Sequence, residues 1–325
     1  MKSTFHSKYG PPGVLSIRDV EVPSPKDNEV LIRVYATTVN RTDTHGVAGT
    51  PFLIRIFSGL FKPKLAITGS DFAGEIEKVG EKVTSFKVGE RVMGFGGVMG
   101  CPSHAEYLAF PETRGIIKMP ANCSYEQAAA CCEASFYAAS IINILKPRAE
   151  QKALVNGATG AIGSAQVQFL KFSGLHVTAV CRGEHEQLVR SLGAEKIIDY
   201  TKEDFTKDNE KYDYVFDAVG KSTFLKCKSL LKKNGIFTSS DGFDNVFWAL
   251  ATRLFGGKKV VFPPPRDINE NLEFIKGLVE QGKFKPVIDR TYPMDRIVEA
   301  FEYVALGQKV GNVVILMNGR SFPRS

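Results

Sequence analysis

The fold of this chain is decided by one stretch, Lys152-Ala153-Leu154-Val155-Asn156-Gly157-Ala158-Thr159-Gly160-Ala161-Ile162-Gly163. A short apolar run is followed by three glycines spaced three residues apart. The residues after them predict a helix that stops at Gly174. Strand, tight glycine turn and helix together present backbone N–H groups and the positive end of a helix dipole, which can hold a pyrophosphate.

The surroundings of the glycine turn favour a dinucleotide site. Leu175–Val180 predicts a second strand, which completes a βαβ unit of the expected size. The spacing is G-x-x-G-x-x-G rather than G-x-G-x-x-G, and the alternative is an ordinary turn without a ligand. The candidate cofactor-binding residues of the turn are Gly157, Ala158, Thr159, Gly160, Ala161, Ile162 and Gly163.

Length and composition indicate a globular enzyme of two domains. The chain has 325 residues, of which 43% are hydrophobic and 24% charged. No apolar run is long enough to span a membrane, and the first residues lack the apolar core of a secretory signal. We therefore expect a cytosolic protein.

The charge and the cysteines are typical of a cytosolic enzyme that binds an anionic cofactor. The formal net charge is +7, but the basic residues are scattered, so an anionic cofactor explains the charge better than a nucleic acid does. The six cysteines lack a disulfide framework and are expected to be reduced, mostly packing, thiols.

The pattern of predicted elements changes near residue 122. Up to about residue 120 the chain is mostly strands with Gly and Pro turns, as in a barrel-like domain. Ser124 and Gln127 then form a capping box for a helix to about Ala138. After the glycine turn, strands and helices alternate: helix 186–192, strand 212–217, helix 223–232, strand 235–239 and strand 258–262. The last part, 287–317, predicts strand, helix, strand. Six strands with intervening helices predict a doubly wound parallel sheet.

Over nearly its whole length the chain resembles the medium-chain dehydrogenase/reductase superfamily, and within it the zinc-independent quinone oxidoreductase-like branch. The resemblance implies an α/β Rossmann sheet plus a mostly β, GroES-like barrel catalytic domain. The catalytic domain would comprise 1–122 and 285–325, and the NADPH-binding domain 123–284. It also implies a homodimer, for which the edge strand Lys258–Phe262 is the expected seam.

The end of the second strand predicts the choice of cofactor. The strand ends in Cys181-Arg182, and no carboxylate follows until Glu184, so nothing at the strand end would accept a bond from a ribose 2′-hydroxyl. Arg182 suits the 2′-phosphate of NADPH, the alternative being a solvated surface arginine. By resemblance, Tyr200 would lie near that phosphate, or else it is a half-buried loop aromatic.

Five further residues are cofactor candidates. Cys181, Val219 and Ser239 lie at or just after predicted strand ends. Gly311 and Asn312 begin a strand that matches the family's closing strand, where they would approach the cofactor or simply form a β-turn.

The zinc motifs of the superfamily are altered. Zinc-dependent members carry C-x-x-D and G-H-E, whereas this chain has Asn40 at the Cys position and Ser70 at the His position. Glu133, or the adjacent Cys132, stands near the third ligand position. Because Asn and Ser are poor zinc ligands, we expect no metal.

Without zinc, the carbonyl of the substrate must be activated by hydrogen bonds or by conjugation. This favours quinones or enones over simple aldehydes as small-molecule substrates. By resemblance, Asn40 and Asp43 face the nicotinamide, the alternative being turn chemistry. Tyr137 stands where relatives usually have Thr, and would donate a proton or narrow the pocket.

Two apolar stretches and two rival functions remain. Phe52–Leu60 is expected to be a loop that walls a substrate pocket or acts as a lid, and Phe243–Phe255 has the spacing of a helix for core or dimer packing. The rivals to a quinone or enone reductase are an alcohol dehydrogenase that lost zinc and a non-catalytic NADPH-binding sensor.

Overall fold

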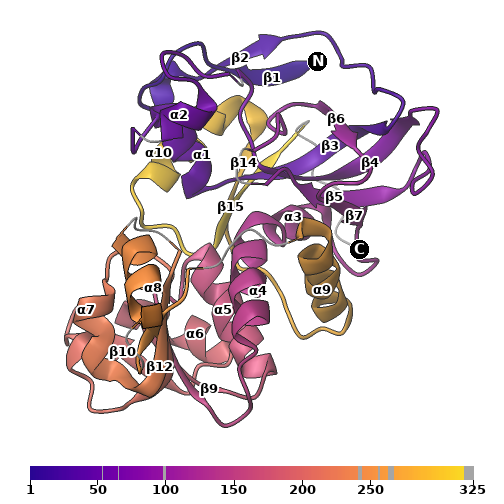
Figure 1. Ribbon diagram of the computed structural model, residues 1–325. Coiled ribbons are helices and arrows are strands. Elements are labelled where there is room, and N and C mark those ends of the chain that lie inside the picture. The colour runs from indigo at the N-terminus through magenta and orange to yellow at the C-terminus, as the bar shows by residue number, and fades with distance from the viewer. Residues whose placement is uncertain are drawn as a thin grey trace. The chain divides into compact units, whose positions relative to one another are not determined.

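The computed structural model describes residues 1–52, 54–64, 66–97, 100–240, 244–254, 257–262 and 267–317, which form two compact units (Figure 1). The first, here the barrel unit, contains the described residues of Met1–Phe136 and those from Asp267 onward. The second, here the Rossmann unit, contains the described residues between Tyr137 and Arg266.

The Rossmann unit is built on a parallel sheet. Its strands lie in the order β10 (Lys196–Asp199), β9 (His176–Cys181), β8 (Lys152–Asn156), β11 (Tyr212–Asp217), β12 (Leu231–Ser239) and β13 (Lys259–Val260). Every neighbouring pair is parallel. The strand order reverses between β8 and β11, so the crevice at their carboxyl ends is the expected ligand position of such a sheet. The predicted doubly wound sheet is confirmed.

Helices follow the strands of this sheet. They are α4 (Glu133–Leu145), which begins in the barrel unit, α5 (Ala161–Phe172), α6 (Glu186–Ser191), α7 (Phe224–Cys227) and α8 (Asp244–Leu254), with short 3-10 turns at Gly183–His185, Phe205–Lys207 and Lys228–Leu230. Leu154, Val180 and Phe237 belong to the buried apolar core, and Phe224 and Trp248 pack beside them with ring centroids 5.7 Å apart.

The glycine turn fits only glycine at two places. Gly157 has φ +80°, where other residues are strained. A Cβ on Gly163 would lie 2.1 Å from the Gly157 carbonyl oxygen, so only a glycine lets α5 pass this close to the turn. The glycines therefore determine how closely α5 approaches β8, in addition to making the turn suitable for binding a ligand.

The barrel unit contains a seven-stranded sheet. Its order is β14 (Ile288–Pro293), β15 (Asn312–Leu316), β3 (Glu29–Val39), β4 (Asp71–Val79), β5 (Arg91–Phe95) and β7 (Ile116–Lys118), and β6 (Tyr107–Pro111) pairs with β3. A separate pair is formed by β1 (Lys2–Phe5) and β2 (Ser16–Asp19). Because β15 is antiparallel to β3, the C-terminal part of the chain completes the N-terminal sheet.

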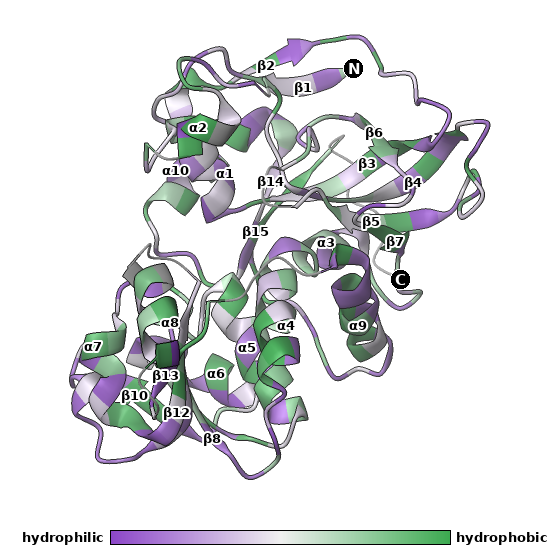
Figure 2. Ribbon diagram, viewed as in Figure 1, coloured by the Kyte–Doolittle hydropathy of each residue, from purple (hydrophilic) through white to green (hydrophobic). Residues whose placement is uncertain are grey.

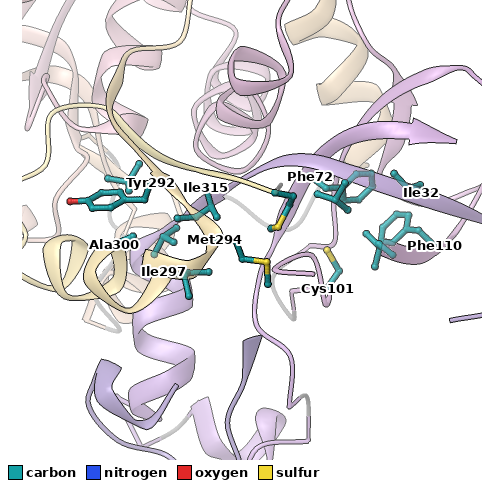
Figure 3. Close-up of a cluster of buried hydrophobic side chains, with 14 of the residues drawn as sticks. Ile32, Phe72, Cys101, Phe110, Tyr292, Met294, Ile297, Ala300 and Ile315 are labelled. Carbon is teal, nitrogen blue, oxygen red and sulfur yellow. The ribbon is translucent and has the colours of Figure 1, made fainter. Parts of the chain in front are cut away.

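Helices cover parts of the barrel unit: α1 (Arg41–Ala48), α2 (Ile54–Ser58), α3 (Tyr125–Ala130), α9 (Ile268–Glu280) and α10 (Ile297–Ala305), with 3-10 turns at Pro12–Val14 and Met294–Arg296. Figure 3 shows the shared core, in which Ile32 and Phe72 of the N-terminal strands join Ile315 of β15 and Ile297 of α10. The capping box of Ser124 and Gln127 at α3 is present as predicted.

Several predicted elements need correction. The helix from Ser124 is interrupted at Cys131 and Cys132 and resumes as α4, which runs on to Leu145. The predicted helix 223–232 ends early, because Leu231 is already extended and pairs with Tyr212. The stretch Phe52–Leu60 is not only a loop, since α2 lies within it. The predicted strand Lys258–Phe262 shrinks to β13, although it does form a sheet edge.

The compact units differ from the expected domains in their boundaries. The expected nucleotide domain, 123–284, includes α3 and α9, which here belong to the barrel unit. Contacts with the barrel unit explain this assignment of α3 and α9. Asn269 of α9 accepts a hydrogen bond of 2.6 Å from the Gly115 N–H, and α3 packs on β3 and β4. The expected bounds of the catalytic and nucleotide-binding domains, which divide the chain by function, remain a prediction.

In the described part of the chain no helix combines the length and the apolar character that crossing a membrane requires.

We predict opposite effects of two glycine-to-alanine substitutions. Gly163→Ala should lower the free energy of unfolding by at least about 1–3 kcal/mol, because the added Cβ overlaps backbone. Gly277→Ala in α9 meets only the Gln281 amide at 3.9 Å and should raise it by about 0.4–1 kcal/mol. Urea unfolding measures both, and equal stability of Gly163→Ala and wild type would contradict the close packing of α5.

Candidate active site

Antiparallel pairing brings two polar segments of the barrel unit together. The end of β3 lies beside the start of β4, with Ala36 opposite Ala73. Asn40, just beyond β3, therefore meets Ser70, just before β4. The first residue of α4, Glu133, comes in against both, and all three side chains are buried.

The amide of Asn40 is at the centre of this cluster. Its Nδ2 donates to Glu133 Oε2 at 2.8 Å, to Thr38 Oγ1 at 2.7 Å and to Asp71 Oδ2 at 3.2 Å. The Ser70 hydroxyl also donates to Glu133 Oε2. The three residues that the sequence comparison put at zinc-ligand positions thus meet as an amide, a hydroxyl and a carboxyl joined by hydrogen bonds. We call Asn40, Ser70 and Glu133 the polar triad.

The hydrogen bonding of Asp43 matches the structural role that turn chemistry predicts for it. Its Oδ2 accepts a 2.8 Å hydrogen bond from the Asn40 backbone N–H and so caps the start of α1. The Asn40 side chain is turned to the triad instead. Of the three residues predicted to be catalytic, Asn40 has its side-chain amide in the cluster, Asp43 supports the backbone next to it, and Tyr137 lies on α4 after Glu133.

A second layer, missed by the sequence analysis, holds the triad. Asp71 accepts from the Thr38 N–H at 2.8 Å and from its hydroxyl at 2.6 Å. The Thr38 carbonyl accepts a hydrogen bond of 2.9 Å from His104 Nε2, and His104 Nδ1 lies 2.7 Å from the Thr68 hydroxyl. Since a carbonyl only accepts, Nε2 carries the proton. Burial lowers the pKa of His104 to about 4, so the ring is neutral. No spacing in the sequence marks this histidine.

The cluster concentrates carboxyl groups in a buried place. Burial, with the charge of Glu133, raises the pKa of Asp71 to about 7. Burial also raises the pKa of Asp43 and of Glu133. Lys309, partly buried, is the nearby cation: burial lowers its pKa to about 8, while Glu133, Asp289 and Asp71 oppose that change. The arrangement can hold and exchange protons near neutral pH.

Two observations bear on metals and on Tyr137. Among the described residues, no group of three or more His, Cys, Asp or Glu is arranged to hold a metal ion. Tyr137 is partly buried and lies four residues after Glu133 in α4, which puts both side chains on one side of that helix.

The Rossmann unit gathers the cofactor candidates at one edge of its sheet. The strand register places Cys181, Asn156, Asp217 and Ser239 at neighbouring strand ends. The Asn156 amide donates to Asp217 Oδ1 at 3.0 Å and ties two of these ends together. The loops after the strands then bring the glycine turn, Arg182, Tyr200 and Val219 to the same edge.

The glycine turn presents donors at this edge. Gly157 and Ala158 donate to the Val180 carbonyl, which fixes the turn against β9. Gly160 caps α5 and has no side chain that could cover its first N–H groups, those of Ala161, Ile162 and Gly163. Thr159 is partly exposed, as are Gly157, Gly160 and Ile162. A cradle of backbone N–H groups on a helix start suits a pyrophosphate.

Arg182 and Tyr200 form an exposed pair beside this cradle. Arg182 Nε donates to the Tyr200 hydroxyl at 3.1 Å, and a guanidinium nitrogen lies 3.7 Å from Glu184. Neither contact buries the cation. The structure therefore orients Arg182 by a neutral partner and leaves its charge available for an anion.

Gly311 and Asn312 lie in the barrel unit, at the start of β15. The Asn312 amide donates to the Val287 carbonyl at 3.0 Å, and Gly311 has φ +86° with no room for a Cβ beside Val287. These contacts favour the turn alternative. Their approach to a cofactor stays a prediction, whereas Lys309, which the sequence analysis did not select, is the charged residue of this segment beside Glu133.

Comparisons with known proteins agree with both units. Residues 26–121 match the family model described as alcohol dehydrogenase GroES-like domain, and residues 192–315 match the one described as zinc-binding dehydrogenase. A human quinone oxidoreductase is 30% identical over 98% of each chain. A chloroplastic NADPH-dependent alkenal/one oxidoreductase of Arabidopsis thaliana is 31% identical over 97% of this chain and 79% of its own length. A solved quinone oxidoreductase from Coxiella burnetii has a TM-score of 0.89 at 25% identity, over 97% of this chain and 99% of that one.

The buried carboxyl groups predict a pH-dependent stability. The pKa of Asp71 is about 7 in the folded chain against an ordinary 3.8, so the folded chain binds this proton more tightly than the unfolded chain. The free energy of unfolding should therefore fall by about 1–3 kcal/mol as the pH rises from about 5 to about 7. Urea unfolding across this range measures it.

The variant Asp71→Asn should flatten that slope, and Asp204→Asn, which neutralises an exposed aspartate of lowered pKa, should not. Stability that rises from about pH 5 to about pH 7 in wild type would contradict the raised pKa of the cluster.

Proposed function

Because the chain belongs to the quinone oxidoreductase-like branch of the medium-chain dehydrogenase/reductase superfamily, we propose that it transfers hydride from NADPH to quinones or other α,β-unsaturated carbonyls without zinc. The observation that carries the proposal is the polar triad. At the positions where zinc-dependent relatives have ligands, Asn40 and Ser70 donate hydrogen bonds to Glu133. Donors directed at a carboxylate occupy the lone pairs that a metal would need.

The match to a zinc-binding dehydrogenase model does not oppose this. It covers residues 192–315 and so includes no member of the triad. An amide nitrogen and a hydroxyl are poor zinc ligands beside the thiolate and imidazole that zinc prefers.

The Rossmann edge supports NADPH as the cofactor. The glycine turn leaves room and donors for a pyrophosphate, Arg182 supplies a cation at the end of β9, and β9 ends without a carboxylate. Bound there, NADPH would supply the hydride. The chain's own residues hold the cofactor: backbone N–H groups bind the diphosphate, and the Arg182 guanidinium pairs with the 2′-phosphate. An alkenal/one oxidoreductase among the relatives is described as NADPH-dependent.

The polar cluster and helix α4 would supply hydrogen bonds and a proton. Both amide hydrogens of Asn40 already point to acceptors of this chain, so its first role is to hold Glu133 and Asp71 in place. The Tyr137 hydroxyl, on the side of α4 that carries Glu133, is the proposed donor to the substrate oxygen. The carboxyl groups of the cluster and Lys309 then return the proton, since their pKa values lie toward neutrality.

We further propose a homodimer in the cytosol. The short strand β13 lies at the edge of the sheet, and the N–H of its Val260 donates to Thr252 Oγ1 of α8 at 3.0 Å, so β13 and α8 together form the proposed seam. On α8, Phe247, Leu250 and Leu254 are exposed at helical spacing and suit a second copy. The six cysteines are free thiols, as a reducing compartment maintains.

Dimerisation can be tested on α8. Leu250→Glu with Leu254→Glu places charges on its exposed apolar face and should shift the sedimentation coefficient from dimer to monomer, because unpaired charges would be buried in the interface. Leu225→Glu, also exposed but on α7, is the control. A wild-type protein that sediments as a monomer at all concentrations would refute the dimer.

Cofactor preference depends on Arg182. A charge-assisted bond to phosphate contributes about 1.5–3 kcal/mol, so Arg182→Ala should weaken NADPH binding roughly 10- to 150-fold and leave NADH binding nearly unchanged. Titration of the cofactor's fluorescence measures both dissociation constants. Arg190→Ala, which removes an exposed arginine paired with Glu186, is the control. Equal losses for the two cofactors would make Arg182 a structural residue and remove the main support for NADPH.

The reaction class predicts a substrate order. A zinc ion stabilises the negative charge that develops on the substrate oxygen by several kcal/mol. A neutral hydrogen-bond donor, which contributes about 2.7–4 kcal/mol, replaces only part of this. Conjugated acceptors spread the charge and need less help, so they should react much faster than benzaldehyde. Comparison of kcat/KM for 1,4-benzoquinone, 9,10-phenanthrenequinone, an enone and benzaldehyde tests this. Tyr137→Phe and Asn40→Ala should each reduce quinone turnover at least about tenfold.

Tyr107→Phe, a tyrosine of β6, is the matched control. Benzaldehyde turnover equal to that of the quinones, or one retained zinc per chain after dialysis against a chelator, would refute zinc-free reduction of conjugated acceptors. Cofactor binding without any turnover would favour the sensor alternative.

A further inference from the structure

The barrel unit carries an exposed apolar patch on α2 and on the residues that flank it, defined here by Phe52, Ile56, Leu60 and Phe61. Phe61 is 89% exposed and Phe52 63% exposed, and Ile56 and Leu60 are exposed as well. Figure 2 shows hydrophobic residues along α2. Large apolar side chains gathered this closely on a surface mark a place of interaction, whereas single exposed ones do not.

The backbone under this α2 patch is held firmly. The Tyr9 hydroxyl donates to the Gly59 carbonyl at 2.6 Å, and Arg55 Nε donates to the Gly49 carbonyl at 3.0 Å. The Arg55 guanidinium also lies 4.7 Å from the centre of the Tyr9 ring. The Lys64 N–H closes the following loop on the Ser58 carbonyl at 2.7 Å. The exposed side chains thus project from a fixed base.

The charges that flank the α2 patch in the sequence have one sign. Arg55 lies within it, and the exposed Lys62 and Lys64 follow it directly. Between residues 41 and 70 the only acidic residue is Asp43, which is buried. Exposed aromatic and aliphatic side chains bordered by basic ones fit a surface that is negatively charged outside and apolar beneath.

We propose that the α2 patch docks the protein on the surface of an anionic lipid membrane. Phe52, Ile56 and Phe61 enter the boundary between headgroups and acyl chains. The stems of Lys62 and Lys64 lie along that apolar layer while their ammonium groups pair with lipid phosphates. The inference goes beyond the proposed function, and it is measured without turnover.

Vesicle sedimentation of the full-length protein tests the docking. Wild type should sediment with vesicles of phosphatidylcholine mixed with phosphatidylglycerol, and much less with phosphatidylcholine alone. Lys62→Glu with Lys64→Glu should weaken binding to the anionic vesicles by at least about fivefold for each residue. Phe52→Ser with Phe61→Ser should weaken it roughly tenfold or more.

Matched controls make the same chemical changes elsewhere. Lys226→Glu with Lys233→Glu reverses two exposed lysines of the Rossmann unit, and Leu225→Ser with Leu306→Ser removes two exposed apolar side chains outside the patch. Both controls should bind anionic vesicles like wild type. A loss in the charge control equal to that in Lys62→Glu with Lys64→Glu would mean non-specific attraction and would overturn the proposal.

A fluorescence reporter gives a second measurement. The chain has a single tryptophan, Trp248, so Trp248→Phe with Phe61→Trp carries its only indole in the patch. Its emission should shift to shorter wavelength when anionic vesicles are added, because the ring leaves water. Wild type, whose tryptophan lies in the Rossmann unit, should show no such shift.

Other occupants of the patch give different outcomes. If it is a substrate lid, Phe52→Ser with Phe61→Ser retains vesicle binding and loses turnover of a water-soluble quinone. If it binds a second copy, the same variant retains vesicle binding and sediments more slowly than wild type. Either result, or wild type that binds no anionic vesicle, overturns the membrane proposal.

Discussion

The hydrogen bond from Asn40 Nδ2 to Glu133 Oε2 joins the end of β3 to the start of α4, and the arrangement of the polar cluster depends on it. A buried carboxyl without donors would cost several kcal/mol. Here Asn40 and Ser70 supply donors from two separate segments, so the position of each is set by the others. Removal of any one would leave polar groups buried and unpaired, which makes the triad a structural requirement whatever its part in the reaction.

The second layer extends this constraint through the sheet. Asp71 is held by the Thr38 backbone and hydroxyl, and the Thr38 carbonyl by a neutral His104. These bonds cross from β3 to β4 and on to the residues before β6. The protonation state of the cluster is therefore coupled to the packing of the sheet, because a change of charge at Asp71 alters the hydrogen bonds that it accepts from the backbone.

Some features were predictable because their causes are local. The glycine spacing predicted the turn between β8 and α5, and the capping box at Ser124 predicted the start of α3. The end of the predicted helix 223–232 depended on pairing of Leu231 with β11, which no local pattern reveals. The same holds for α2 and for the interruption at Cys131, where tertiary packing overrides the propensity of a short segment.

The candidate site shows the same division. Asn40, Ser70 and Glu133 could be selected because motif spacing aligns them with known ligand positions, and the structure brings them together. His104 comes from a segment without a motif, and Lys309 was not selected although it precedes the strand that resembles the family's closing strand. The antiparallel pairing of distant strands places both near the triad. Contacts between residues that are far apart in sequence carry no periodic signal.

Charge at the edge of the Rossmann sheet depends on how carboxylates are engaged as well as on where they lie. Asp199, at the end of β10, is the acid closest to the Arg182 loop by register. Its Oδ1 accepts from the Thr201 N–H at 3.0 Å and from the Thr201 hydroxyl at 2.7 Å, and a Gly183 backbone bond also contributes to holding its pKa below the ordinary value. The acid is thus held ionised by donors from its own loop and from the loop that carries Arg182. Glu184 meets Arg182 only at 3.7 Å and in solvent, where such a pair contributes little. The edge therefore presents the Arg182 cation beside the backbone N–H groups of the glycine turn, and the proposed preference for NADPH rests on this arrangement.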